Sequence, residues 1–180
     1  MDKFSQESNR FRNSKPESSK KSTKDIIREI VDYSFQKDAY MGHRIEGDYL
    51  IAYMVEKARE LQYLKEGEVM EKPQNENAYI GIAVHSASDL HFISKLIVMV
   101  TVIDEKGGVI GKQQHLYHPR PGLHNYGMNW ILPGDGLYTI QVHIENSDLK
   151  WGREMKDNNP PEVVEVEFPH VMIQTGQHIS

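Results

Sequence analysis

Residues 95–103 read Lys-Leu-Ile-Val-Met-Val-Thr-Val-Ile, and residues 104–108 continue as Asp-Glu-Lys-Gly-Gly. β-Branched residues pack well on a pleated surface, so the first stretch predicts a β-strand. Acidic residues followed by a glycine pair favour a tight turn, because glycine adopts turn conformations at no steric cost. Residues 109–116 are therefore expected to pair back on residues 95–103 as a hairpin.

Four further stretches show the two-residue period of a β-strand. Residues 48–55 are apolar on both faces, which is typical of a central strand. Residues 161–168 alternate glutamate with apolar residues, which is typical of an edge strand protected from stray pairing. The other two stretches are residues 79–84 and 137–144. Short strands separated by turns, with no β-α-β alternation, predict an all-β fold: an immunoglobulin-like antiparallel β-sandwich over residues 40–175.

The N-terminal part of the chain has a different character. Residues 1–23 are rich in Ser, Lys, Asn and Glu, which predicts a disordered tail. Residues 24–36 have a helical period, with Thr23 as the N-cap, and predict one amphipathic helix. Its apolar stripe needs a surface to cover, either a sheet face or the same helix of a second subunit. The stripe consists of Ile26, Ile27, Ile30, Val31, Ser34 and Phe35.

Bulk composition excludes several classes of protein. The net charge of −5 argues against nucleic acid or an anionic membrane as the main partner. The chain has no cysteine, which excludes disulfides, thiolate metal sites and thiol catalysis. No segment approaches the roughly 20 apolar residues of a membrane helix, so direct membrane insertion is not expected. The N-terminus lacks the apolar core of a secretory signal, which favours the cytoplasm for the chain as written but leaves its compartment open.

Histidine is the residue type that points to a site. The chain has nine histidines, and three of them, His115, His118 and His124, fall in one short segment. Prolines and a glycine in that segment predict a rigid loop, and histidines on a rigid loop can preorganise a metal site. The alternative is a set of surface histidines without a ligand. His85 and His91 flank a second loop, which could converge with the first at one end of the sandwich.

The remaining candidates refine the kind of metal. Met128 follows His124 by four residues and is a possible soft ligand. Without thiolates, a set of His with Met or carboxylate favours copper or iron over a structural zinc site. His143 on its own strand is interpreted as a structural histidine. The chain lacks the common hydrolase, phosphate-binding, dinucleotide and metalloprotease motifs, so an enzyme is not expected.

Three segments together resemble a known family. They are residues 95–111, residues 122–130 (Gly-Leu-His-Asn-Tyr-Gly-Met-Asn-Trp) and residues 134–144 (Gly-Asp-Gly-Leu-Tyr-Thr-Ile-Gln-Val-His-Ile). This pattern resembles the periplasmic iron-transport proteins, whose motif is Gly-Pro-His-Tyr-Gly with a liganding methionine six to seven residues earlier. The resemblance extends over residues 48–168. It implies an immunoglobulin-like homodimer that binds copper or iron and works beside a membrane iron permease.

The resemblance also implies a ligand set. His124 matches the motif histidine, with Asn125 as an insertion, and the methionine position falls at Tyr117 or His118. His85 is the histidine retained on the strand before residues 95–103, and Glu154 is nearest to the family's last histidine. The expected metal ligands are thus His124, His118 and His85, with Glu154 or Met128 as further candidates. The alternative function is an interaction module of the same fold that has lost its metal site.

Overall fold

Ten β-strands account for the regular structure of the part of the chain that the computed structural model describes, which comprises residue 25 and residues 40–64, 68–120, 123–146 and 163–175. The predicted tail and the amphipathic helix lie outside these residues, apart from Asp25. None of the described residues belongs to a helix long and apolar enough to cross a membrane. The strands are β1 (Tyr40–Glu46), β2 (Tyr49–Glu56), β3 (Leu61–Leu64), β4 (Glu68–Glu71), β5 (Ala78–Ser86), β6 (Leu96–Asp104), β7 (Val109–Arg120), β8 (Leu123–Trp130), β9 (Gly136–Asn146) and β10 (Val164–Ile173).

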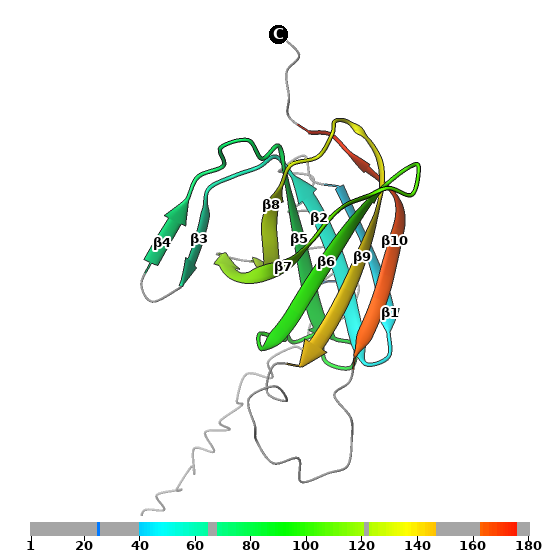
Figure 1. The fold of residues 1–180 in the computed structure, drawn as a ribbon. Coiled ribbons are helices and arrows are strands. Elements are labelled where there is room, and N and C mark those ends of the chain that lie inside the picture. The colour runs from blue at the N-terminus through cyan, green and yellow to red at the C-terminus, as the bar shows by residue number, and fades with distance from the viewer. Residues whose placement is uncertain (1–24, 26–39, 65–67, 121–122, 147–162, 176–180) are drawn as a thin grey trace, which may run out of the picture.

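Eight of the strands form one antiparallel sheet in the order β1-β2-β5-β8-β7-β6-β9-β10, while β3 and β4 form a separate hairpin. Figure 1 shows that the sheet curls, which brings β1 and β10 side by side and gives a nearly closed barrel. The prediction of an all-β antiparallel fold is confirmed. Two separate sheets, as an immunoglobulin-like sandwich requires, are not seen among the described strands.

The reason for the single sheet is the length of β7. The first part of this strand pairs with β6, from Val109 to His115. The second part pairs with β8, from Leu116 to Arg120. A strand that changes partner along its length joins the two halves by hydrogen bonds, so no edge separates them.

The predicted strands lie where the sequence placed them, within a few residues at their ends. Three features were missed. β1 forms a hairpin with β2 through a turn at Gly47, which has a positive φ of 55°. The β3–β4 hairpin was not predicted. The segment around the clustered histidines was predicted to be a loop, but β7 and β8 extend through it as paired strands.

The core fills the inside of the curled sheet. Alternate residues of β6, β9 and β10 point inward, and their intervening neighbours are exposed or half-buried. Near the open seam between β1 and β10, the ring of Tyr53 on β2 lies 4.8 Å from the ring of Phe168 on β10. On β10 the exposed Glu165 and Glu167 discourage further strand addition, as predicted for an edge strand. Inward residues at the centre include Ile80, Ile82, Val98, Val100, Val102 and Ile140, all with no exposed surface.

Substitution at the centre of this core provides a test of the fold. Ile140→Ala should lower the free energy of unfolding by about 2–5 kcal/mol, because it removes buried methyl groups and leaves a cavity. Ile131→Ala is the matched control, since Ile131 is 60% exposed, and it should change stability by less than about 0.5 kcal/mol. Urea unfolding followed by circular dichroism measures both. Equal losses of stability in the two variants would contradict the placement of the Ile140 side chain in the core.

Candidate functional site

The β7–β8 hairpin carries most of the residues that the sequence singled out. Its register runs without a shift from Leu116 opposite Gly127 to Arg120 opposite Leu123. Directly opposed residues of antiparallel strands point to the same face, and neighbours along a strand point to opposite faces. His118 lies opposite Asn125, whereas His124 lies opposite Pro119. The hairpin therefore places His118 and His124 on opposite faces of the sheet.

The register also separates the two residues nearest to the family motif. In the family pattern the motif histidine directly precedes Tyr-Gly, and here Asn125 stands between His124 and Tyr126-Gly127. The pairing of β8 with β7 and with β5 is regular at these residues. His124, the predicted match to the motif histidine, therefore lies on one face of the sheet, and Asn125 lies on the other face beside His118.

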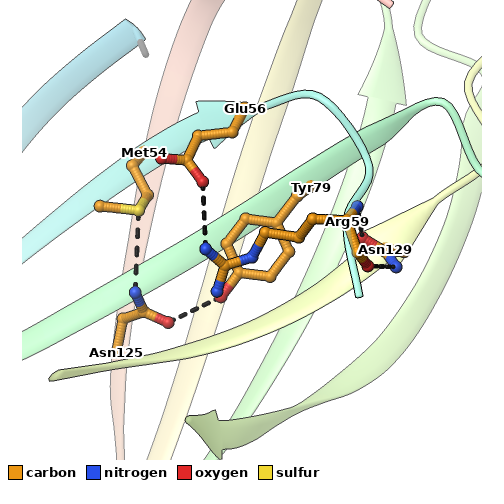
Figure 2. A network of polar contacts seen from close by, with 6 residues as sticks. All are labelled: Met54, Glu56, Arg59, Tyr79, Asn125 and Asn129. Atoms are coloured by element: carbon orange, nitrogen blue, oxygen red, sulfur yellow. Dashed lines mark hydrogen bonds and ion pairs between the residues drawn. The ribbon is translucent and has the colours of Figure 1, made fainter. Parts of the chain in front are cut away.

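Asn125 lies at the centre of a buried polar network on the outer face of the sheet (Figure 2). The hydroxyl of Tyr79 donates to Asn125 Oδ1 at 2.7 Å, and Asn125 Nδ2 donates to the sulfur of Met54 at 3.7 Å. Tyr79 and Asn125 have no exposed surface. His118 is also buried, and its Nε2 donates to the carbonyl of Gly127 at 3.0 Å. We call these four side chains, Met54, Tyr79, His118 and Asn125, the outer-face network.

Gly127 is part of the same arrangement. A Cβ atom on Gly127 would overlap the hydroxyl and ring of Tyr79, so only glycine allows the tyrosine to cross this position. Tyr79 reaches Asn125 by lying across β8 at Gly127. Glycine is therefore required at position 127 for a packing reason.

Arg59 covers the network from outside. Its guanidinium lies 4.1 Å from the centre of the Tyr79 ring and donates to Glu56 at 3.3 Å. The backbone of Arg59 also exchanges two hydrogen bonds with the side chain of Asn129, at 3.2 and 2.8 Å. These contacts hold the chain between β2 and β3 against β8, as Figure 2 shows.

The residues of the outer-face network do not fit a metal ion. Asn125 contributes a carboxamide, and both ends of this group already have hydrogen-bond partners. The Met54 sulfur accepts one of these bonds, and the Nε2 atom of His118 is held by a carbonyl. Neutral amides are poor ligands for copper or iron compared with imidazole or thioether. We interpret the outer-face network as a structural element of the sheet.

The other predicted ligands lie at one end of the barrel. Phe92 pairs with His85 in an isolated β-bridge, and its ring lies among the rings of His85, Tyr117 and His124. The ring of His85 lies 5.6 Å from Phe92 and the ring of His124 lies 5.5 Å from it. Tyr117 stacks on both Phe92 and His124, at 5.6 and 6.0 Å. We call His85, His91, Phe92, Tyr117 and His124 the histidine end.

All three imidazoles of the histidine end are oriented by an oxygen on Nδ1. His85 Nδ1 lies 3.0 Å from the carbonyl of Leu90, and His91 Nδ1 lies 2.6 Å from a carboxylate oxygen of Asp89. These oxygens only accept, so the proton is on Nδ1 and the lone pair of the neutral ring is on Nε2. His124 Nδ1 lies 2.8 Å from the Tyr117 hydroxyl, which takes either role. This is the outer-shell arrangement of metal-binding histidines.

His85 is the most constrained of the three. Its Nε2 atom is buried and has no hydrogen-bond partner in the structure. Burial lowers the pKa of His85, and positive charge on His91 and His124 lowers it further, against the opposing effect of the Leu90 carbonyl. A neutral imidazole with an unused lone pair is the form that binds a metal.

The five predicted ligands do not form one cluster. Met128 lies on the same strand as His124, four residues away, which is about 13 Å along an extended strand. His118 is on the opposite face, and Glu154 lies outside the described residues. Within the part of the chain that the structure describes, no three His, Asp or Glu side chains are grouped closely enough to hold a metal ion. The structure brings His85 and His124 to one end and adds His91.

Two other histidines have structural partners. His143 lies between two carboxylates, with Nε2 2.8 Å from Glu145 and Nδ1 2.9 Å from Glu165. These contacts, that of Glu145 first, raise the pKa of His143. Sequence reasoning missed this bridge because Glu165 is on another strand. His115 is buried against Trp130, whose indole donates to it at 3.1 Å, and burial lowers the pKa of His115 to about 3.

Known proteins resemble this chain in structure rather than in sequence. No family model matches the sequence. No curated protein matches it either. Among solved structures, FetP of uropathogenic Escherichia coli strain F11 superposes with a TM-score of 0.54 at 16% identity, over 76% of this chain and 98% of FetP. Copper-reconstituted P19 of Campylobacter jejuni superposes with a TM-score of 0.58 at 12% identity, over 74% of this chain and 96% of P19.

The chain shares the fold of FetP and P19. A copper-bound variant of FetP agrees as well, with a TM-score of 0.56 at 16% identity over 75% of this chain and 99% of the variant. The resemblance to the iron-transport family is thus confirmed at the level of the fold.

Removing one hydroxyl tests the outer-face network. Tyr79→Phe should lower the free energy of unfolding by about 1–3 kcal/mol, because Asn125 Oδ1 is left buried without its donor. Tyr117→Phe is the matched control. It removes the exposed bond to His124 and should cost less than about 0.5 kcal/mol. Thermal or urea unfolding in the absence of metal compares the two variants, and similar losses would show that the network adds no stability.

The His143 bridge predicts a pH dependence of stability. A histidine whose pKa is raised in the folded protein stabilises it fully below its ordinary value of 6.5. That contribution is lost as the pH rises through the raised pKa. The stability difference between wild type and His143→Gln should therefore be larger at about pH 6 than at about pH 9. Other titratable groups, including His115, are common to both proteins, so their contributions to the pH dependence cancel in the difference. A difference that grows with pH would contradict the ion-pair interpretation.

Proposed function

We propose that this chain is a non-catalytic metal-binding protein that handles copper or iron in support of iron transport. The metal would bind at the histidine end, through Nε2 of His85 and His124, with His91 as a third ligand. The observation that carries this proposal is the hydrogen-bonding pattern that the three imidazoles share. Each has Nδ1 engaged by an oxygen atom, and His85 keeps a buried Nε2 without a partner.

To bind one metal ion, the side chains of His91 and His124 would have to change position. The His91 side chain is 64% exposed, and His124 is also exposed, so both can change rotamer without disturbing the core. His85 is anchored by Leu90 and by the edge of Phe92 and would stay in place. Neutral imidazole suits Cu, Zn, Ni and Fe, and Cu(II) binds most tightly among divalent ions in a given nitrogen site.

The choice of copper or iron rests on the fold. FetP and P19 share this fold, and solved structures of both contain copper. The resemblance to their family also implies a homodimer that serves a membrane iron permease, and both belong to this proposal. The proposed site at the histidine end is separate from the outer-face network.

Calorimetric titration of copper and ferrous iron into protein purified without an affinity tag tests the proposal. Wild type should bind with a measurable heat, and His85→Ala and His124→Ala should each weaken binding by at least about 10–100-fold, the loss seen even for outer-shell partners. Metal at about 100 times its Kd should stabilise the wild type by about 2.7 kcal/mol in thermal unfolding.

Two controls make the titration specific. His43→Ala removes an exposed histidine of β1 and should leave the affinity unchanged. Asn125→Ala changes the outer-face network and should alter stability without altering affinity. Unchanged binding in both His85→Ala and His124→Ala would exclude the histidine end as the site.

A second function is supported by one observation. Asn125, the residue directly before Tyr126-Gly127, is held by hydrogen bonds at both ends of its carboxamide. This favours an interaction module that keeps the fold of a metal-binding family and has lost its metal. A protein that gives no heat and no thermal stabilisation with any divalent metal would be such a module.

A further inference from the structure

The outer face of β2 and β5 is buried although it lies opposite the core. Leu50, Ala52, Met54 and Ala83 are exposed by 1%, 4%, 3% and 5%, respectively. They are not members of the core cluster, because their neighbours along each strand, such as Ile51 and Val84, point into the barrel. The outside of a curled sheet normally meets water. Burial on this face therefore requires an element that lies on it.

The shape of this face suits a helix. Ala52 lies opposite Ala83, and Met54 lies opposite Gly81, so the middle of the face carries small side chains between longer ones. His43, opposite Ala52 on β1, is exposed, so the covering element lies towards β5 and not over β1.

The N-terminal segment has the right length and origin to be this element. Residues 24–36 carry an apolar stripe, and the chain reaches β1 a few residues later at Tyr40. Tyr40 lies opposite Val55, so the chain arrives beside Met54. A helix over residues 24–35 is about 18 Å long. The row from Leu50 to Met54 is about 13 Å long, so such a helix spans it.

We propose that residues 24–36 dock as an amphipathic helix on the outer face of β2 and β5, over Leu50, Ala52, Met54 and Ala83. The stripe of Ile26, Ile27, Ile30 and Val31 faces the sheet and fills the trough of small residues. Asp25, on the polar side of that helix, is exposed as this docking requires. The helix lies beside the outer-face network and shields it from water.

Thiol labelling tests the docking cleanly, because the chain has no cysteine of its own. Ala52→Cys is made in the full chain, in a chain lacking residues 1–22 and in a chain lacking residues 1–36. The thiol should be protected in the first two proteins. It should react at least about 10-fold faster with a maleimide in the third, because a covered thiol reacts only when its cover opens. Equal rates in all three proteins would overturn the proposal.

Further variants distinguish loss of the helix from unfolding of the sheet. His43→Cys should react quickly in every background, and Val100→Cys, in the core, should stay protected in every background. If removal of residues 1–36 unfolds the sheet and exposes Val100→Cys, the full chain with Ile30→Asp replaces it. Glu29→Lys, on the polar face, is its matched control and should keep the protection of Ala52→Cys. Labelling of Ala52→Cys that rises on dilution would mean that a second copy covers the face, and it would overturn docking within one chain.

Discussion

Backbone pairing between β7 and β8 is the constraint on which the arrangement of the candidate site depends. The register of this hairpin is regular, so successive side chains alternate strictly between the inside and the outside of the barrel. One residue of displacement would exchange His124 for Asn125 and His118 for Tyr117. The hairpin also ties the two halves of the sheet together, because β7 leaves β6 where it joins β8.

This alternation separates two chemistries that are adjacent in the sequence. On the outside, Asn125 and His118 join Tyr79 and Met54 in a buried network that satisfies its polar groups and crosses Gly127. A buried network with its partners in place rigidifies the sheet and leaves little for a metal to bind. At the end of the barrel, the ring of His124 stacks on Tyr117, lies tilted against Phe92 and is accessible to solvent. Stability and candidate binding function are thus assigned to opposite faces of one hairpin.

Part of the site could be predicted from residue types alone. The clustered histidines, the absence of cysteine and the loop flanked by His85 and His91 all pointed to imidazole ligands at one end of the fold. The ligand set could not be predicted, because membership depends on the face that each side chain occupies. His118 and His124 are close in the chain and were grouped together, although strand pairing puts them on opposite sides. The His143 bridge needed a carboxylate from β10, which no local pattern indicates.

By itself the sequence determined the class of the fold and most of its strands, because alternation and β-branched composition are local properties of the chain. It also determined the available chemistry, since a chain without cysteine and with nine histidines has few choices of ligand. Only the tertiary structure decided that one curled sheet forms in place of two, because β7 pairs with a different strand in each half. Only the tertiary structure decided that His124 and Asn125 are placed on opposite faces of the sheet. Both outcomes depend on the register between strands, which is set by backbone hydrogen bonds between distant segments and leaves no mark in the local sequence.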